Sequence, residues 1–255
     1  MLKKRIIPIQ LLVGGRLVKT VGFDRWRDVG DPVKSSAVYN SQYADELIFL
    51  NIERDARDTK ALAKVIQSVS EVSFMPISFG GGITSAQDAA FLILNGSDKV
   101  VVNSIAYRDP SVITATADSF GNQAIVACID VRWDAEAGDY QLYSDCGRRS
   151  QSVRLEEHID ALRRAGVGEI MIQSMDRDGT MSGYDVPLIK RVMSAASGIP
   201  VIAAGGAGNY AHLLEAFVET NVSALACGSL FNFSDSNPLR AKAFLSNSGL
   251  QFKKV

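Results

Sequence analysis

One stretch of this sequence occurs twice, and it decides the fold. Residues 45–55 are DELIFLNIERD, and they align without gaps to residues 168–178, which are GEIMIQSMDRD. Further along the chain after each of these stretches, FGGGI at residues 79–83 corresponds to AGGAG at residues 204–208. The chain is therefore expected to consist of two related halves.

Around the repeated stretch, short runs rich in Val and Ile alternate with segments of helical periodicity. This alternation is typical of βα units around a parallel sheet. We expect strands at residues 5–11, 46–51, 75–79, 99–103, 125–130, 169–174, 200–204 and 224–228. We expect helices at residues 34–43, 58–69, 85–95, 109–120, 153–165, 186–195, 212–220 and 238–246. Eight such units predict an α/β fold of the TIM type, a (β/α)8 barrel with a two-fold half-barrel repeat; a doubly wound open sheet is the alternative.

The composition excludes several classes of protein. A chain of 255 residues, of which 47% are hydrophobic, suits one barrel domain over residues 1–255. The net charge of −1 provides no overall field that would recruit nucleic acid or an anionic membrane. No apolar run approaches the roughly 20 residues that span a bilayer, so no membrane association is expected.

The cysteines argue against a disulfide framework and against a zinc site. Cys128, Cys146 and Cys227 are odd in number, far apart and without metal-ligand spacing. We therefore expect a cytoplasmic protein that uses neither a metal nor another cofactor.

Glycine-rich turns follow the third and seventh predicted strands. Glycine lets backbone N–H groups approach an anion closely, and a following helix N-terminus adds a favourable dipole. A phosphate site after strands seven and eight is recurrent in barrels. We predict that site at Gly205, Gly206, Ala207, Gly228 and Ser229, and by the repeat a second one at Gly81, Gly82, Asn103 and Ser104. Two facing sites imply a ligand with phosphate at both ends, whereas the alternative is that these glycines serve only tight βα turns.

Three long segments are expected as loops at the same end of the barrel. They cover residues 14–32, 132–152 and 176–185. The glycine and polar residues of the first and third are typical of mobile lids over a substrate.

Four motifs spread over nearly the whole chain occur together. They are MLKKRII at residues 1–7, FGGGI at 79–83, DRDGT followed by SGYD within 176–185, and GGAG at 205–208. Together they resemble the HisF family, the cyclase subunits of imidazole glycerol phosphate synthase. The DRDGT and SGYD pair is highly specific, whereas GGGI alone is weak.

The resemblance implies a synthase subunit that works with a HisH-like glutaminase. In that family, ammonia from a glutaminase at the N-terminal barrel face crosses the barrel to a bisphosphate substrate, which is cyclised and cleaved to imidazole glycerol phosphate. Two aspartates at the ends of strands one and five act as general acid and base, as paired carboxylates with different pKa values can. Asp130 matches one of them, but Leu11 stands where the other is expected. Leucine transfers no proton, so the resemblance implies weak cyclase activity here.

At other positions, some residues match the family and others differ from it. The ring of Arg5, Glu46, Lys99 and Glu169 matches the family's charged ring around the ammonia entrance; the alternative is a solvated cluster of salt bridges. Three residues depart from the family, and together they suggest a retuned pocket. They are Asn51 in place of aspartate, Gln173 in place of threonine and Ala204 in place of serine.

Several further residues are candidates with simpler alternatives. Lys19 matches a flexible-loop lysine that closes over a phosphate, and Asp178 and Gly179 of DRDGT are also expected at a phosphate; an exposed lysine without a task is the alternative. We expect His158 and His212 to pack or to lie on the surface. Trp133 is placed to stack on a substrate ring or to pack into the wall.

Three functions are compatible with these residues. The first is a diverged HisF-like ammonia conduit that serves a separate amidotransferase, which installs acetamidino groups on surface-polysaccharide sugars. The second is an authentic cyclase subunit of histidine biosynthesis. The third is a scaffold barrel that binds a phosphorylated small molecule without catalysis.

Overall fold

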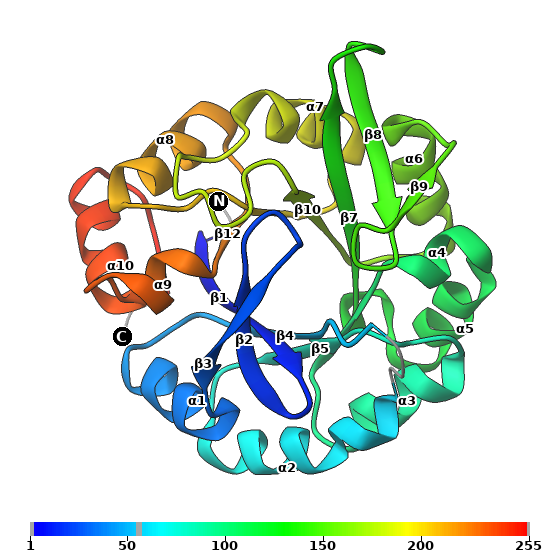
Figure 1. Cartoon of the computed structure of the whole chain (residues 1–255), viewed down its shortest axis with the longest axis horizontal. Coiled ribbons are helices and arrows are strands. Elements are labelled where there is room, and N and C mark those ends of the chain that lie inside the picture. Colours follow the sequence, from blue (N-terminus) through cyan, green and yellow to red (C-terminus); the bar gives the residue numbers. More distant parts are fainter. Residues whose placement is uncertain (1–2, 55–57, 254–255) are drawn as a thin grey trace.

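A closed barrel of parallel strands forms the centre of the molecule. The structure is a computed structural model that describes residues 3–54 and 58–253, so Met1, Leu2 and Asp55 of the quoted motifs lie outside the described residues. The barrel strands are β1 (Arg5–Val13), β4 (Leu47–Asn51), β5 (Ile77–Gly80), β6 (Lys99–Val102), β7 (Ile125–Asp134), β10 (Glu169–Ser174), β11 (Val201–Ala204) and β12 (Ala224–Cys227). They pair in this order, and β12 pairs with β1, so the sheet closes (Figure 1). The predicted (β/α)8 barrel is confirmed, and the open sheet is excluded by the closure.

Helices surround the barrel on all sides (Figure 1). The main ones are α1 (Pro32–Ser41), α2 (Ala63–Val72), α3 (Ala86–Leu94), α5 (Ser111–Phe120), α6 (Leu155–Ala165), α7 (Val186–Ala196), α8 (Tyr210–Thr220) and α10 (Pro238–Asn247). Shorter turns are η1 (Thr59–Leu62), α4 (Ser104–Arg108), η2 (Asn122–Ala124) and α9 (Ser229–Phe233). Their starts follow local sequence, because Asp31, Asp185 and Asn237 each cap a helix with a side-chain oxygen and precede a proline-containing first turn.

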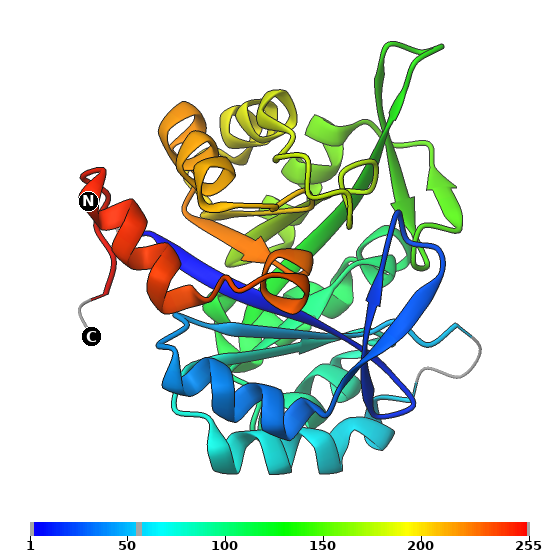
Figure 2. The same cartoon turned by 60° about the vertical axis from the view of Figure 1, so that its left-hand side comes forward.

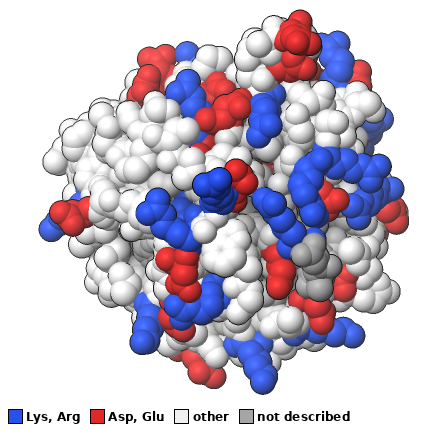
Figure 3. Space-filling model, in the orientation of Figure 1, with Lys and Arg blue, Asp and Glu red and all other residues white. Residues whose placement is uncertain are grey.

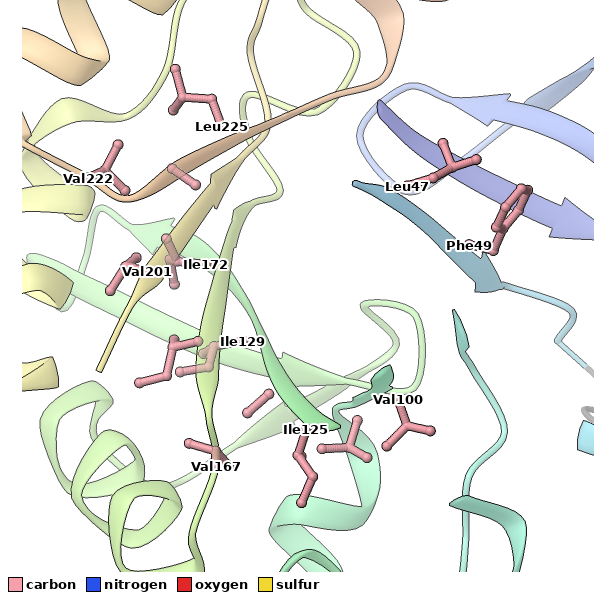
Figure 4. Close-up of a cluster of buried hydrophobic side chains, with 14 of the residues drawn as sticks. Leu47, Phe49, Val100, Ile125, Ile129, Val167, Ile172, Val201, Val222 and Leu225 are labelled. Carbon is pink, nitrogen blue, oxygen red and sulfur yellow. The ribbon is translucent and has the colours of Figure 1, made fainter. Parts of the chain in front are cut away.

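Strand side chains alternate between two apolar layers. Residues such as Leu47 and Phe49 belong to the outer layer (Figure 4), and the ring of Phe49 stacks on that of Phe79 with centroids 4.7 Å apart. Residues such as Ile48, Val101 and Met171 face inward and fill the barrel. Each fully buried side chain of this size contributes about 1.5–3 kcal/mol. The lumen is therefore a packed hydrocarbon core that separates the two ends of the barrel.

The internal repeat holds at the level of the backbone. Gly81 and Gly205 both have φ of +94°, a conformation that glycine adopts without strain. A Cβ on Gly81 would lie 2.0 Å from the carbonyl oxygen of Asn51, and one on Gly205 would lie 2.6 Å from that of Ser174. Asn51 and Ser174 occupy equivalent positions in the repeated stretch. In each half, the first residue after the strand, Gly81 after β5 and Gly205 after β11, therefore lies against the end of the preceding barrel strand, one position away from the pairing of Gly81 with Gly206 in the sequence alignment.

The expected loops 14–32 and 132–152 are instead β-ribbons, so this part of the prediction is wrong. Strands β2 (Arg16–Thr20) and β3 (Trp26–Gly30) extend β1 as antiparallel partners. β7 likewise continues past the barrel and pairs with β8 (Asp139–Ser144), which pairs with β9 (Arg149–Gln151). Figure 2 shows both ribbons at the end of the barrel opposite the chain termini. Within the described ranges, the helices are too short or too polar to cross a bilayer.

Candidate active site

A cavity of about 470 Å³ opens at the C-terminal ends of the barrel strands. Four quadrants line it, and each comes from two neighbouring strands. β5 and β6 lead into one glycine turn and Asn103, while β11 and β12 lead into the other glycine turn and Ser229. Between them lie β7 with β10 on one side and β1 with β4 on the other. Figure 3 shows this face, where basic and acidic side chains intermingle around the centre.

Asp130 is the candidate acid/base group of the cavity. It is only 6% exposed, and it lies on β7 within the barrel wall. Asn103 donates a hydrogen bond of 2.9 Å to Oδ2, and the Cys128 thiol donates one of 3.3 Å to Oδ1. Burial raises the pKa of Asp130 to about 7, with a further contribution from the charge of Asp178, while the two hydrogen bonds oppose the rise. A carboxyl with this pKa can accept or donate a proton at neutral pH.

Two features of this group escaped the sequence analysis. Cys128 was not singled out, although residues two apart on a strand share a face and it therefore had to lie beside Asp130. Asn103 was predicted as a phosphate residue, yet its amide is directed at Asp130, and its own Oδ1 is buried without a hydrogen-bond partner in the described part of the chain.

Leu11 lies on the wall opposite Asp130, since β1 and β7 are four strands apart around the barrel. It is partly exposed in the cavity and pairs with Leu50 of β4. Asn51 and Gln173 also line the cavity. Ala204 belongs to the inner apolar layer and is not among the residues that line the cavity, although the sequence placed it at the mouth.

The residues predicted to bind phosphate gather at two opposite edges of the cavity. Gly205, Gly206, Ala207, Gly228 and Ser229 form one edge, and Gly81, Gly82, Asn103 and Ser104 form the other. The Ser229 hydroxyl is buried and has no protein partner within the described residues. The Ser104 hydroxyl accepts a hydrogen bond of 3.1 Å from the backbone N–H of Asp145. We refer to these two sets as the Ser229 cradle and the Ser104 cradle.

Lys19 lies on a strand and not in a loop, and its ammonium group is engaged by a carboxylate. It lies on β2, is 5% exposed, and its Nζ is 3.0 Å from Oδ1 of Asp178. Thr20 donates a hydrogen bond of 2.9 Å to the other carboxylate oxygen of Asp178. A Cβ on Gly179 would lie 2.8 Å from Cα of Val21, so this glycine permits the close approach of the two segments. A Cβ on Gly228 would lie 3.0 Å from Cε of Lys19, which places the lysine beside the Ser229 cradle.

The four predicted gate residues form a closed ring of ion pairs at the N-terminal end. Arg5 contacts Glu46 at 2.5 Å and Glu169 at 2.6 Å, and Lys99 contacts the same two carboxylates at 2.9 and 2.5 Å. Burial would lower the pKa of Arg5, but Glu169 and Glu46 outweigh it and raise that pKa. Burial would raise the pKa of Glu169, but Arg5 and Lys99 outweigh it and lower that pKa. The ring is thus mostly buried and is not a solvated cluster.

The remaining candidates lie away from the cavity. His158 is buried and stacks on Tyr107 with ring centroids 4.0 Å apart, and burial lowers its pKa to about 4. His212 is on α8, where its backbone N–H donates to Asn209. Trp133 is 48% exposed, and its ring packs edge-on against Tyr140 outside the cavity.

The comparison with known proteins agrees with the positions of the shared motifs. A family model described as "Histidine biosynthesis protein" matches residues 5–236. The chain belongs to this family. It is 37% identical over 253 residues to the imidazole glycerol phosphate synthase subunit HisF of Staphylococcus carnosus, with 99% of both chains covered. It is 40% identical over 250 residues to the subunit of Lactiplantibacillus plantarum, with 98% of this chain and 99% of the relative covered. It is 39% identical over 255 residues to that of Hyphomonas neptunium, with both chains fully covered.

The resemblance to HisF that the motifs indicated is therefore confirmed, and the chain is a HisF-like synthase subunit. Its shared motifs have structural places: FGGGI begins on β5, GGAG follows β11, and DRDGT follows β10 at the cavity. The HisF-like barrel thus combines the family's glycine turns with a leucine on the wall opposite Asp130.

Proposed function

We propose that the chain carries ammonia from a glutaminase subunit to a phosphorylated acceptor. The glutaminase docks at the N-terminal face, ammonia passes the ring and the apolar lumen, and the acceptor lies in the cavity at the other end. One observation carries this proposal: among the described residues, an inner layer of mostly apolar side chains lies between a buried charged ring and a polar cavity. The names of the relatives support the same class of synthase subunit.

The surface around the ring supports a protein partner there. Phe74 is 90% exposed and Leu94 is 77% exposed. Phe74 follows α2 and Leu94 ends α3, and helices of a βα barrel end at the N-terminal face. Large exposed apolar side chains of this kind are common anchors of protein interfaces.

The acceptor is held by its phosphate groups in the Ser104 and Ser229 cradles. Asp130 accepts and donates the protons of the reaction. Attack of ammonia on an electrophilic carbon releases a proton, which a carboxylate accepts, and a leaving group then requires one. With Leu11 opposite, Asp130 must serve both steps, so we propose weak cyclase activity and a main role in supplying ammonia to an amidotransferase for acetamidino sugars of surface polysaccharide. The second candidate, a full cyclase of histidine biosynthesis, is favoured by the names of the relatives.

Two experiments separate these functions. Co-expression with a HisH-type glutaminase should give a complex that copurifies and hydrolyses glutamine faster than the glutaminase alone; no copurification would favour the scaffold. Rescue of a histidine auxotroph that lacks its own cyclase subunit would favour the second candidate, and failure to rescue with an intact complex is the result we expect.

A further inference from the structure

The two walls between the cradles differ in chemistry. On β1, Ile9, Leu11 and Val13 alternate with buried residues and are partly exposed inside the cavity. Leu50 of β4 lies beside Leu11 in the sheet and is also partly exposed. Apart from Asn51 at the end of β4, this wall presents hydrocarbon side chains to a ligand.

The facing wall presents hydrogen-bonding groups. β7 contributes Asp130, and β10 contributes Gln173, which pairs with Asp130 in the sheet. Asn103 lies at the same side through its hydrogen bond to Asp130. A ligand suspended between the cradles therefore meets polar partners on one side and hydrocarbon on the other.

We propose that the cavity selects a phosphate ester whose body turns an apolar ring or chain toward Ile9, Leu11, Val13 and Leu50. This inference deepens the proposed function and rests on its phosphate cradles. A polyol phosphate would bring hydroxyl groups against these four aliphatic side chains, which offer no hydrogen bond in place of the lost water. An apolar body binds more tightly there, because removing the apolar surface of the wall and of the ligand from water lowers the free energy of the complex.

A matched pair of ligands tests the inference. Cyclohexyl phosphate and myo-inositol 1-phosphate share a six-carbon ring and one phosphate and differ only in the five hydroxyl groups of inositol. We expect isothermal titration of the full chain to give binding of cyclohexyl phosphate about tenfold tighter. Leu11→Asn should bring the ratio of the two dissociation constants close to one, whereas Leu239→Asn, an exposed leucine of α10, should leave it unchanged.

Binding of inorganic phosphate tests the phosphate cradles separately from the preference for an apolar ester. If phosphate binds and displaces both esters, but the two esters bind equally, the inference is overturned and the cradles stand. If the preference persists in Leu11→Asn, β1 is not its source and the inference is again overturned. If neither phosphate nor either ester binds, the cradles and the inference fall together.

Discussion

The thiol of Cys128 donates a hydrogen bond of 3.3 Å to Oδ1 of Asp130. The two side chains lie two residues apart on β7 and share its inner face. Because this hydrogen bond favours the ionised carboxylate, the thiol holds the pKa of Asp130 lower than burial alone would set it.

Replacement of the thiol should therefore raise the pKa of Asp130. We expect Cys128→Ala to move the pKa upward from about 7, because the ionised form loses a donor, whereas Cys128→Ser keeps one and should stay closer to the parent. Titration of the Asp130 carboxyl carbon followed by ¹³C NMR gives this pKa directly. An unchanged pKa in Cys128→Ala would mean that the thiol does not act on the carboxylate.

The raised pKa of Asp130 predicts a pH-dependent effect on stability. Folding raises this pKa from an ordinary 3.8 to about 7. The folded chain thus binds the proton more tightly, so this contribution to stability is complete below pH 3.8, declines as the pH rises and is lost above pH 7. We expect Asp130→Asn to gain stability relative to the parent between pH 4 and pH 8, by up to about 4 kcal/mol. Urea midpoints at both pH values measure this, and a difference independent of pH would contradict it.

Leu11 predicts slow cyclisation. With free ammonia and the bisphosphate substrate of the HisF family, the chain should form imidazole glycerol phosphate about 10²–10⁴-fold more slowly than a member with both aspartates, because a positioned acid or base is missing. Leu11→Asp should raise turnover more than affinity. Efficient cyclisation by the unmodified chain would return it to histidine biosynthesis.

Substitution in the ring of ion pairs should impair ammonia transfer from glutamine without impairing the reaction with free ammonia. Lys99→Ala leaves Glu46 and Glu169 with a single cation, which should destabilise the fold by about 3–5 kcal/mol and lower activity with glutamine relative to activity with free ammonia. Lys60→Ala, an exposed lysine of η1, is the control. If substitution at each of the four ring positions left this ratio unchanged, the conduit role would fail.

The cradles predict two bound phosphates. Calorimetry should give two sites per chain, and Ser229→Ala should weaken one of them about tenfold, because a buried hydroxyl with no partner in the described part of the chain is available to donate to the anion. Ser119→Ala, on the exposed side of α5, should change neither site. A single site, or one insensitive to Ser229, would leave the second cradle without support.

The sequence predicted the barrel better than it predicted the contacts at its mouth. The β-ribbon after β1 had a local signal that was missed, because Gly14 and Gly15 both adopt positive φ, as tight hairpin turns require. The ion pair of Lys19 with Asp178 had none, since its partners are 159 residues apart and meet only when the barrel closes. The opposite placement of Leu11 and Asp130 follows from strand order, so it could be predicted once the barrel was assumed.

The ring of ion pairs also determines how the side chains at the N-terminal end of the barrel can move. Each carboxylate serves both cations, so no contact can break by itself without leaving a buried charge short of a partner. Small displacements are resisted, and a larger one must move all four groups together. The four side chains therefore form one cooperative unit, in which opening the ring requires all of them to move together and leaves buried charges unpaired.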